Sequence, residues 1–396
     1  MRSTHDRFLI KVSFTQAQEA APELEVGPTR VRGQSNAAAG DFWQFDVMGL
    51  TPSTPYKLAL TSSAGRPLCE PWQLSTFPAP DSMPEKLRLM IYTCGGGHDA
   101  LSEGLPDGQI SFLPSALRRR LLQRGLSFKP DALIANGDQI YWDLRAPLSI
   151  KRVPEALRVK IAGTFDRSLP VFGTLRYGKL VEILLYDIRR TQTLAGPSAV
   201  FVDGTVEAWL KSRMTDREMI HVVNIPSNPP GWSAGKWGEW YPDILSKDGK
   251  LTTDVPKPYW QSGWLKQHDR LMAEIAAMPG RIPLVVSGDL HAIAEGRMMR
   301  CGGLDFSRKP VNVILSGPLG TGDRGWPSAF RGIGASPPTH LTMEEDLKPI
   351  EENGFILADF TAESITVRYF RFNYHKQSPD MIDTLEPFRV TELKRS

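Results

Sequence analysis

Hydrophobic and polar positions follow two different patterns along the chain, and the change falls near residue 80. In the first part, short apolar runs and alternating apolar and polar positions occupy residues 8–14, 42–47 and 56–60. Alternation with a period of two is typical of β-strands that bury one face. We therefore expect residues 1–80 to form a small all-β domain, with a β-sandwich favoured over other all-β folds.

Beyond residue 85, short buried strands alternate with helices. The strand candidates are continuous apolar runs at 87–92, 132–135, 183–186, 221–225, 284–286 and 311–315. Helical patterns, with apolar residues three and four positions apart, lie at 114–123, 206–214 and 259–278. Two more strands are expected at 354–360 and 365–372. Strands that alternate with helices predict an α/β domain over residues 85–396.

Three prolines, Pro78, Pro80 and Pro84, indicate a linker between the two regions. The length of 396 residues agrees with two domains, since one domain usually has about 100–200 residues. Within the first region, residues 49–56 are similar to the turn before a central strand in fibronectin type III-like sandwiches. We therefore expect a fibronectin III-like β-sandwich ahead of a larger α/β domain.

Composition excludes several classes of protein. Charged residues make up 23% of the chain and the net charge is only +3, so we find no nucleic-acid-binding signature. Three cysteines are too few for a disulfide framework, which leaves a cysteine available for chemistry. No apolar stretch reaches the roughly 18 residues of a transmembrane helix, and no signal peptide is visible. We expect a cytoplasmic protein, and an exported mature form remains an alternative.

Three of the buried strands end in residues that can bind metal ions. These strand ends are Thr93-Cys94, Gly137-Asp138 and Gly288-Asp289-Leu290-His291, and Tyr141 stands three residues after Asp138. Ligands of α/β domains gather beyond the carboxyl ends of the strands. A mixed set of thiol, carboxylate, imidazole and phenol groups there is typical of a metal site.

The residue types suit a site with two metal ions. Such a site needs a bridging oxygen, and an Asp directly after a glycine can reach between the ions. Phenolate and thiolate ligands suit ferric iron, while carboxylates suit harder divalent ions. Two metal ions activate a water and stabilise the charge that develops when a phosphate ester is hydrolysed.

These blocks, in this order, resemble the PhoD-like metallophosphoesterases, calcineurin-like enzymes related to the purple acid phosphatases. The resemblance covers roughly residues 85–396 and implies an αββα sandwich that hydrolyses small phosphate esters. It implies that Asp138 bridges two metals and that Cys94, Tyr141 and His291 bind the iron. Asp138 and His291 would be the catalytic residues. Asp289 would serve the second metal. The implied cofactor is Fe³⁺ with Ca²⁺ or another divalent ion.

The sequence departs from this family in its centre. Family members carry an Asp-Asp-His-rich segment followed by an Asn, and no Asp-Asp-His occurs here. The domain is expected to be shortened near residues 165–178. Asn224, Asp143 and His98 are additional ligand candidates that could replace the missing groups. The alternative function is therefore a catalytically impaired relative that binds a metal or a partner.

Each candidate also has a structural interpretation. Cys94 could be a small buried apolar residue, Asp138 could shape a turn, and His291 could be a satisfied buried histidine. Asp289 could cap a helix over residues 292–294. The Trp- and Gly-rich segment 231–241 could form an apolar wall for the leaving group or a packed surface loop.

Overall fold

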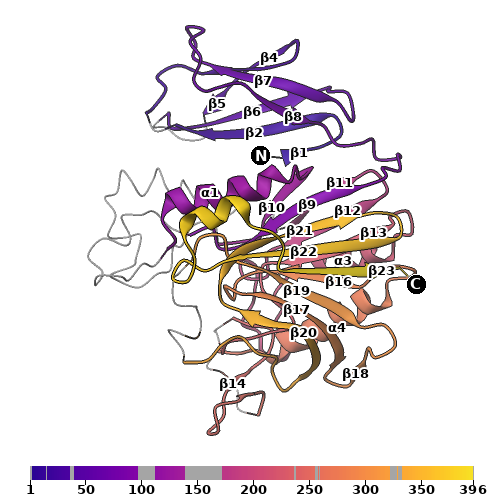
Figure 1. Ribbon diagram of the computed structural model, residues 1–396. Helices are drawn as coiled ribbons and strands as arrows, with labels where there is room; N and C mark the ends of the chain where they lie inside the picture. Colours follow the sequence, from indigo (N-terminus) through magenta and orange to yellow (C-terminus); the bar gives the residue numbers. More distant parts are fainter. Residues whose placement is uncertain are drawn as a thin grey trace. The chain divides into compact units, whose positions relative to one another are not determined.

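The computed structural model divides into two compact units, whose elements are labelled in Figure 1. It describes residues 2–14, 16–35, 40–96, 112–138, 172–235, 238–254, 257, 259–321, 328 and 332–395. The described part of the first unit runs to Pro84 and includes Leu175–Lys179. The second unit contains the remaining described residues from Glu85 onward.

The first unit consists of two four-stranded antiparallel sheets. One sheet has the order β1 (Arg2–Ser3), β2 (Arg7–Ser13), β6 (Phe42–Met48) and β5 (Gln34–Ser35). The other has the order β4 (Thr29–Arg32), β3 (Glu23–Val26), β7 (Pro55–Thr61) and β8 (Trp72–Ser75). Phe8 and Phe45 of the first sheet share one apolar core with Leu24 and Leu58 of the second. This is a β-sandwich, and its likeness to fibronectin type III domains stays a prediction.

The remaining long strands form two mixed sheets, which belong to the second unit except for the last three residues of β11. The five-stranded sheet has the order β10 (Ala132–Ala135), β9 (Leu87–Tyr92), β21 (Asn353–Phe360), β22 (Ser364–Phe372) and β23 (Arg389–Lys394). The eight-stranded sheet has the order β11 (Phe172–Tyr177), β12 (Val181–Tyr186), β13 (His221–Pro226), β16 (Leu284–Ser287), β19 (Val311–Ser316), β17 (Ile293–Cys301) and β18 (Leu304–Asp305). β20 (Leu341–Ile350) pairs with β17, and β14 (Ile244–Leu245) pairs with β15 (Leu251–Thr252).

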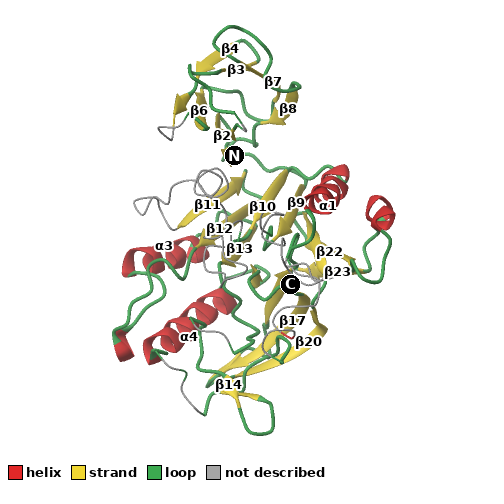
Figure 2. Cartoon of the chain, turned by 90° about the vertical axis from the view of Figure 1, so that its left-hand side faces the viewer, coloured by secondary structure: helices red, strands yellow, loops and turns green. Residues whose placement is uncertain are grey.

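Helices cover the outer faces of both sheets. α1 (Ser115–Ser127) buries Leu121 in one apolar core with Met90 of β9 and Phe355 of β21. α3 (Gly204–Thr215) and α4 (Ser262–Ala277) pack on the eight-stranded sheet. Figure 2 shows α3 and α4 on one side of β12 and β13, and α1 on the other. The short 3₁₀ helices are η3 (Gly196–Ser198) and η4 (Pro379–Thr384). The layers are those of an αββα sandwich.

The periodicity of the sequence explains these elements. β12, β13 and β16 are parallel neighbours with both faces covered, so nearly every position is buried, as the continuous apolar runs predict. α4 buries Trp264, Leu271 and Ile275, which recur on one face of the helix. The predicted strands and helices of the second region that fall on described residues are confirmed.

Two structural expectations are wrong. Residues 292–294 do not begin a helix that Asp289 could cap, because Ile293 starts the nine-residue strand β17. Trp232 and Trp240 do not form an exposed apolar wall, since both are fully buried in the core shared with α4, and Trp237 falls outside the described residues. Among the described helices, none has the length and apolar character needed to cross a membrane.

Stability should fall in mild acid because of one buried histidine. His221 in β13 is 1% exposed, and its Nε2 donates to the carbonyl of Thr361 at 2.6 Å. Burial lowers the pKa of His221 from 6.5 to about 4. Only the unfolded chain then gains this proton between these pH values. The stabilisation from the neutral histidine is therefore fully present above pH 6.5. The free energy of unfolding decreases by about 3 kcal/mol as the pH falls from 6.5 to 4.

Urea unfolding of the wild type and His221→Gln at pH 7.5, 5.5 and 4.5 measures this effect. The variant lacks the titrating group, so its stability should vary less with pH over this range. Equal pH dependence of the two proteins would contradict the assignment.

Candidate metal centre

Two of the predicted strand ends are joined by backbone hydrogen bonds. β9 and β10 are parallel neighbours, with Tyr92 opposite Ala135. In the turns that follow, Cys94 N donates to Gly137 O at 3.2 Å and Gly95 N donates to Asp138 O at 3.1 Å. The backbone therefore fixes the Cys94 turn against the Asp138 turn.

The third strand end, after β16 of the other sheet, packs directly on Thr93. A Cβ atom added to Gly288 would lie 2.3 Å from the Cβ of Thr93, so only glycine fits at this position. The Thr93 hydroxyl donates to Asn136 O at 2.7 Å, which ties the same residue to the β10 strand end. Thr93 thus stands at the meeting point of the three turns, and Gly288 permits their close approach.

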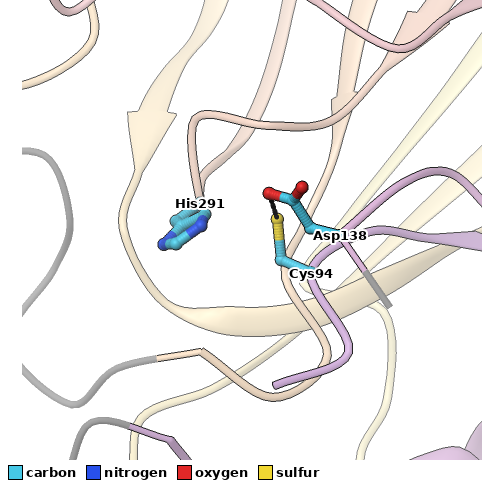
Figure 3. Close-up of side chains that lie close together, drawn as sticks. All are labelled: Cys94, Asp138 and His291. Carbon is cyan, nitrogen blue, oxygen red and sulfur yellow. Dashed lines mark hydrogen bonds between the residues drawn. The ribbon is translucent and has the colours of Figure 1, made fainter. Parts of the chain in front are cut away.

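This packing brings three potential ligand atoms together. The thiol of Cys94, a carboxylate oxygen of Asp138 and an imidazole nitrogen of His291 all lie within 4.8 Å of one another. The Sγ of Cys94 is 3.6 Å from Oδ2 of Asp138 and points toward it in Figure 3. Cys94 is buried, whereas Asp138 and His291 are partly exposed. The site is therefore anchored in the core and open to solvent on one side.

The backbone is in an unfavourable conformation at these positions. Cys94, Asp138 and His291 have φ values of 51°, 51° and 50°, and Asp289 has 70°. Only seven non-glycine residues in the described part of the chain have positive φ, and these are four of them. Left-handed backbone costs about 1–3 kcal/mol per residue and tends to cluster at functional sites. The unfavourable backbone at four neighbouring positions therefore supports a functional role for this site.

Asp289 is held apart from this cluster by two polar neighbours. Its side chain is 4% exposed, and its Oδ2 accepts from Arg189 Nη2 at 3.0 Å and from Asn228 Nδ2 at 3.3 Å. The three donor atoms that meet come from other residues. Sequence reasoning missed Arg189 and Asn228, although both follow the ends of parallel strands, β12 and β13, where it looked for ligands.

Two solved structures share this architecture. The structure of PhoD matches with a TM-score of 0.59 and 11% identity, over 99% of this chain and 87% of that chain. Purple acid phosphatase PPD1 from yellow lupin (Lupinus luteus) seeds matches with a TM-score of 0.60 and 11% identity, over 100% of this chain and 73% of that one. The chain has the fold of the PhoD-like metallophosphoesterases. No protein-family model and no curated protein matches the sequence.

The PhoD-like fold does not bring every predicted ligand to the strand ends. Asn224 lies in the middle of β13, and its amide donates to the sulfur of Met214 in α3 at 3.7 Å. It therefore faces α3 and the helix-covered core, whereas Cys94, Asp138 and His291 lie in the turns that follow the strands. Tyr141, Asp143 and His98 fall outside the described residues.

The three converging side chains fit a metal ion. They offer one sulfur, one oxygen and one nitrogen, a combination that suits iron or zinc better than magnesium or calcium. The cluster supplies ligands from three separate turns, which lets the fold fix their directions before a metal binds. Cys94, Asp138 and His291 are therefore suited to hold one ion.

Proposed function

We propose that the protein hydrolyses small phosphate esters with the help of bound metal. The observation that supports this most strongly is the convergence of Cys94, Asp138 and His291 within 4.8 Å at the strand ends of a PhoD-like fold. Thiolate, carboxylate and imidazole groups that meet at the ends of the strands suit metal-assisted hydrolysis. The proposed reaction is of the alkaline phosphatase or phosphodiesterase type.

The proposed roles follow from which side chains meet. Cys94 and His291 would hold an iron-like ion, and Asp138 would supply a carboxylate to this ion and to a second one. When bound, the ions supply an activated water and neutralise charge on the phosphate. The family resemblance assigns Tyr141, outside the described residues, to the iron, and Asp289 would serve a second ion, Ca²⁺ or another divalent cation.

Arg189 is proposed to orient the substrate at the Asp289 side of the site. Its guanidinium contacts the buried Asp289 carboxylate, and about a third of the Arg189 side chain is exposed. Guanidinium groups bind phosphate oxygens through paired hydrogen bonds. Asp289 is two residues before His291, so a phosphate ester near His291 would meet the positive charge of Arg189 beside this turn.

Metal analysis combined with turnover of an aryl phosphate tests the proposal. The purified full-length chain should contain iron together with a divalent metal and should release the aryl alcohol. Chelation should abolish turnover, and addition of Fe²⁺ and Ca²⁺ under air should restore it. Absence of both bound metal and turnover after this reconstitution would overturn the proposal.

A metal-binding protein without hydrolytic activity is the second candidate. It is favoured by the contact of Asp289 with Arg189 and Asn228, because this leaves three donor atoms that meet among the described residues, enough for one ion. Under this alternative, the wild type binds one metal per chain at this centre and turns over no aryl phosphate.

A further inference from the structure

A second group of metal-binding side chains lies in the same unit, outside the candidate metal centre. His268 and Asp269 are consecutive residues of α4, and Cys301 ends β17. Cys301 Sγ is 3.0 Å from Asp269 Oδ1 and 3.4 Å from His268 Nδ1, and the last two atoms are 3.2 Å apart. His268 and Cys301 are fully buried.

The hydrogen bond on the far side of His268 sets its tautomer. Nε2 lies 3.1 Å from the carbonyl of Pro230, and a carbonyl can only accept, so Nε2 carries the hydrogen. In the neutral ring, Nδ1 therefore directs a lone pair at the carboxylate of Asp269. The single proton of the Cys301 thiol can serve only one of these two acceptors. A divalent cation can accept a lone pair from all three atoms at once.

The three atoms are at least as close together as the ligands of one metal ion, so a small outward movement would open the group around an ion. With ordinary Zn–N, Zn–O and Zn–S bond lengths, the edges of such a tetrahedron are about 3.3–3.5 Å. The three observed separations are 3.0, 3.2 and 3.4 Å. A histidine that donates its other nitrogen to a backbone carbonyl is also the usual arrangement of a metal ligand.

His340, just before β20, orients the carboxylate. Its Nε2 lies 3.0 Å from Asp269 Oδ1, and the backbone N of Gly302 donates to His340 O. A Cβ on Gly302 would lie 2.6 Å from the His340 ring, and Gly302 has φ +55°, so glycine is required for this approach. The Asp269 side chain is 29% exposed, which leaves one side of the group open to water.

We propose that His268 Nδ1, Asp269 Oδ1 and Cys301 Sγ bind a divalent cation, Zn²⁺ by the chemistry of the donors. Water occupies the fourth position, and His340 is a positioning residue for Asp269. The ion fastens α4 to β17 and β20, so its role is to stabilise this part of the fold. This proposal does not rest on hydrolytic activity at the other centre.

Zinc content tests the proposal in a full-length chain whose other centre is dismantled by Cys94→Ser and His291→Ala. After chelation, Zn²⁺ addition and dialysis, this protein should retain one zinc per chain. Saturation at a hundredfold excess over Kd should raise its Tm by about 5 °C. Adding Cys301→Ser should abolish both effects, because serine keeps a donor to Asp269 and removes the sulfur ligand. Cys69→Ser, at an exposed cysteine, is the matched control and should change neither.

Cobalt substitution supplies a readout independent of stability. Co²⁺ should give a thiolate charge-transfer band in the Cys94→Ser, His291→Ala protein, and Cys301→Ser should remove it. Asp269→Asn should weaken Zn²⁺ affinity at least tenfold. This second variant tests the site independently if Cys301→Ser fails to fold. Zinc that is absent from the starting protein, or that binds the Cys301→Ser and Asp269→Asn proteins as tightly as the parent, would overturn the proposal.

Discussion

Asp138→Asn should lower kcat/KM for an aryl phosphate by about a thousandfold, or about 4 kcal/mol of transition-state stabilisation. The change removes the negative charge of the Asp138 carboxylate, whose Oδ2 lies 3.6 Å from Cys94 Sγ. It also replaces a proposed bridging ligand by a weaker one. The fold should be preserved, because asparagine tolerates the left-handed backbone that residue 138 adopts at φ 51°. Steady-state kinetics and metal analysis of the same preparation measure both effects.

Asp203→Asn is a matched control for this substitution. Asp203 caps α3, and its side chain accepts from Val206 N, a role that asparagine performs equally well. The control should keep wild-type kcat/KM and metal content. Full activity of Asp138→Asn would contradict the proposed function. A loss of metal in a protein that shows no turnover in either form would favour the metal-binding alternative.

The strands and helices of the second unit follow from local patterns in the sequence. Each parallel strand is buried on both faces and therefore appears as a continuous apolar run, as in 183–186 and 221–225. The rule that ligands gather at strand ends then places Cys94, Asp138 and His291 together before any coordinates are known. The structure brings these three side chains within 4.8 Å.

Contacts between distant segments could not be predicted in this way. Arg189 and Asp289 are 100 residues apart, and no local pattern relates them. The proposed zinc-binding group joins α4 to β17 across 32 residues. The sequence pattern around Cys301 does not indicate which residues it contacts. Asn224 precedes the end of β13 at Pro226 by two residues, and its side chain faces α3.

Gly288→Ala should strongly destabilise the protein, because it adds a methyl group where the strand ends of the two sheets meet. The new Cβ would lie 2.2 Å from Oγ1 and 2.3 Å from Cβ of Thr93, distances that no rotamer change can relieve. The φ of Gly288 is outside the left-handed region, so the effect is steric alone. Overpacking of this kind costs about 3 kcal/mol or more, which lowers Tm by about 6–10 °C.

The same substitution should also disrupt the metal centre, because Thr93 cannot move without its neighbour Cys94. The Thr93 hydroxyl holds Asn136 O and lies 3.3 Å from Cys94 Sγ, so a shift of Thr93 changes the ligand separation at Asp138 as well. Metal affinity should therefore fall at least tenfold in protein that remains folded. Gly204→Ala is the control: nothing lies within 4 Å of its new Cβ, and it should be neutral or slightly stabilising.

A double-mutant cycle separates this steric coupling from a general loss of stability. Thr93→Gly removes the atoms that the new methyl group meets, so its combination with Gly288→Ala should be less destabilising than the sum of the two single changes by at least 1 kcal/mol. Additive effects would show that the two residues do not press on each other. Because Gly288 follows a strand of one sheet and Thr93 follows a strand of the other, the coupling energy measures how tightly the two sheets are joined at the metal centre.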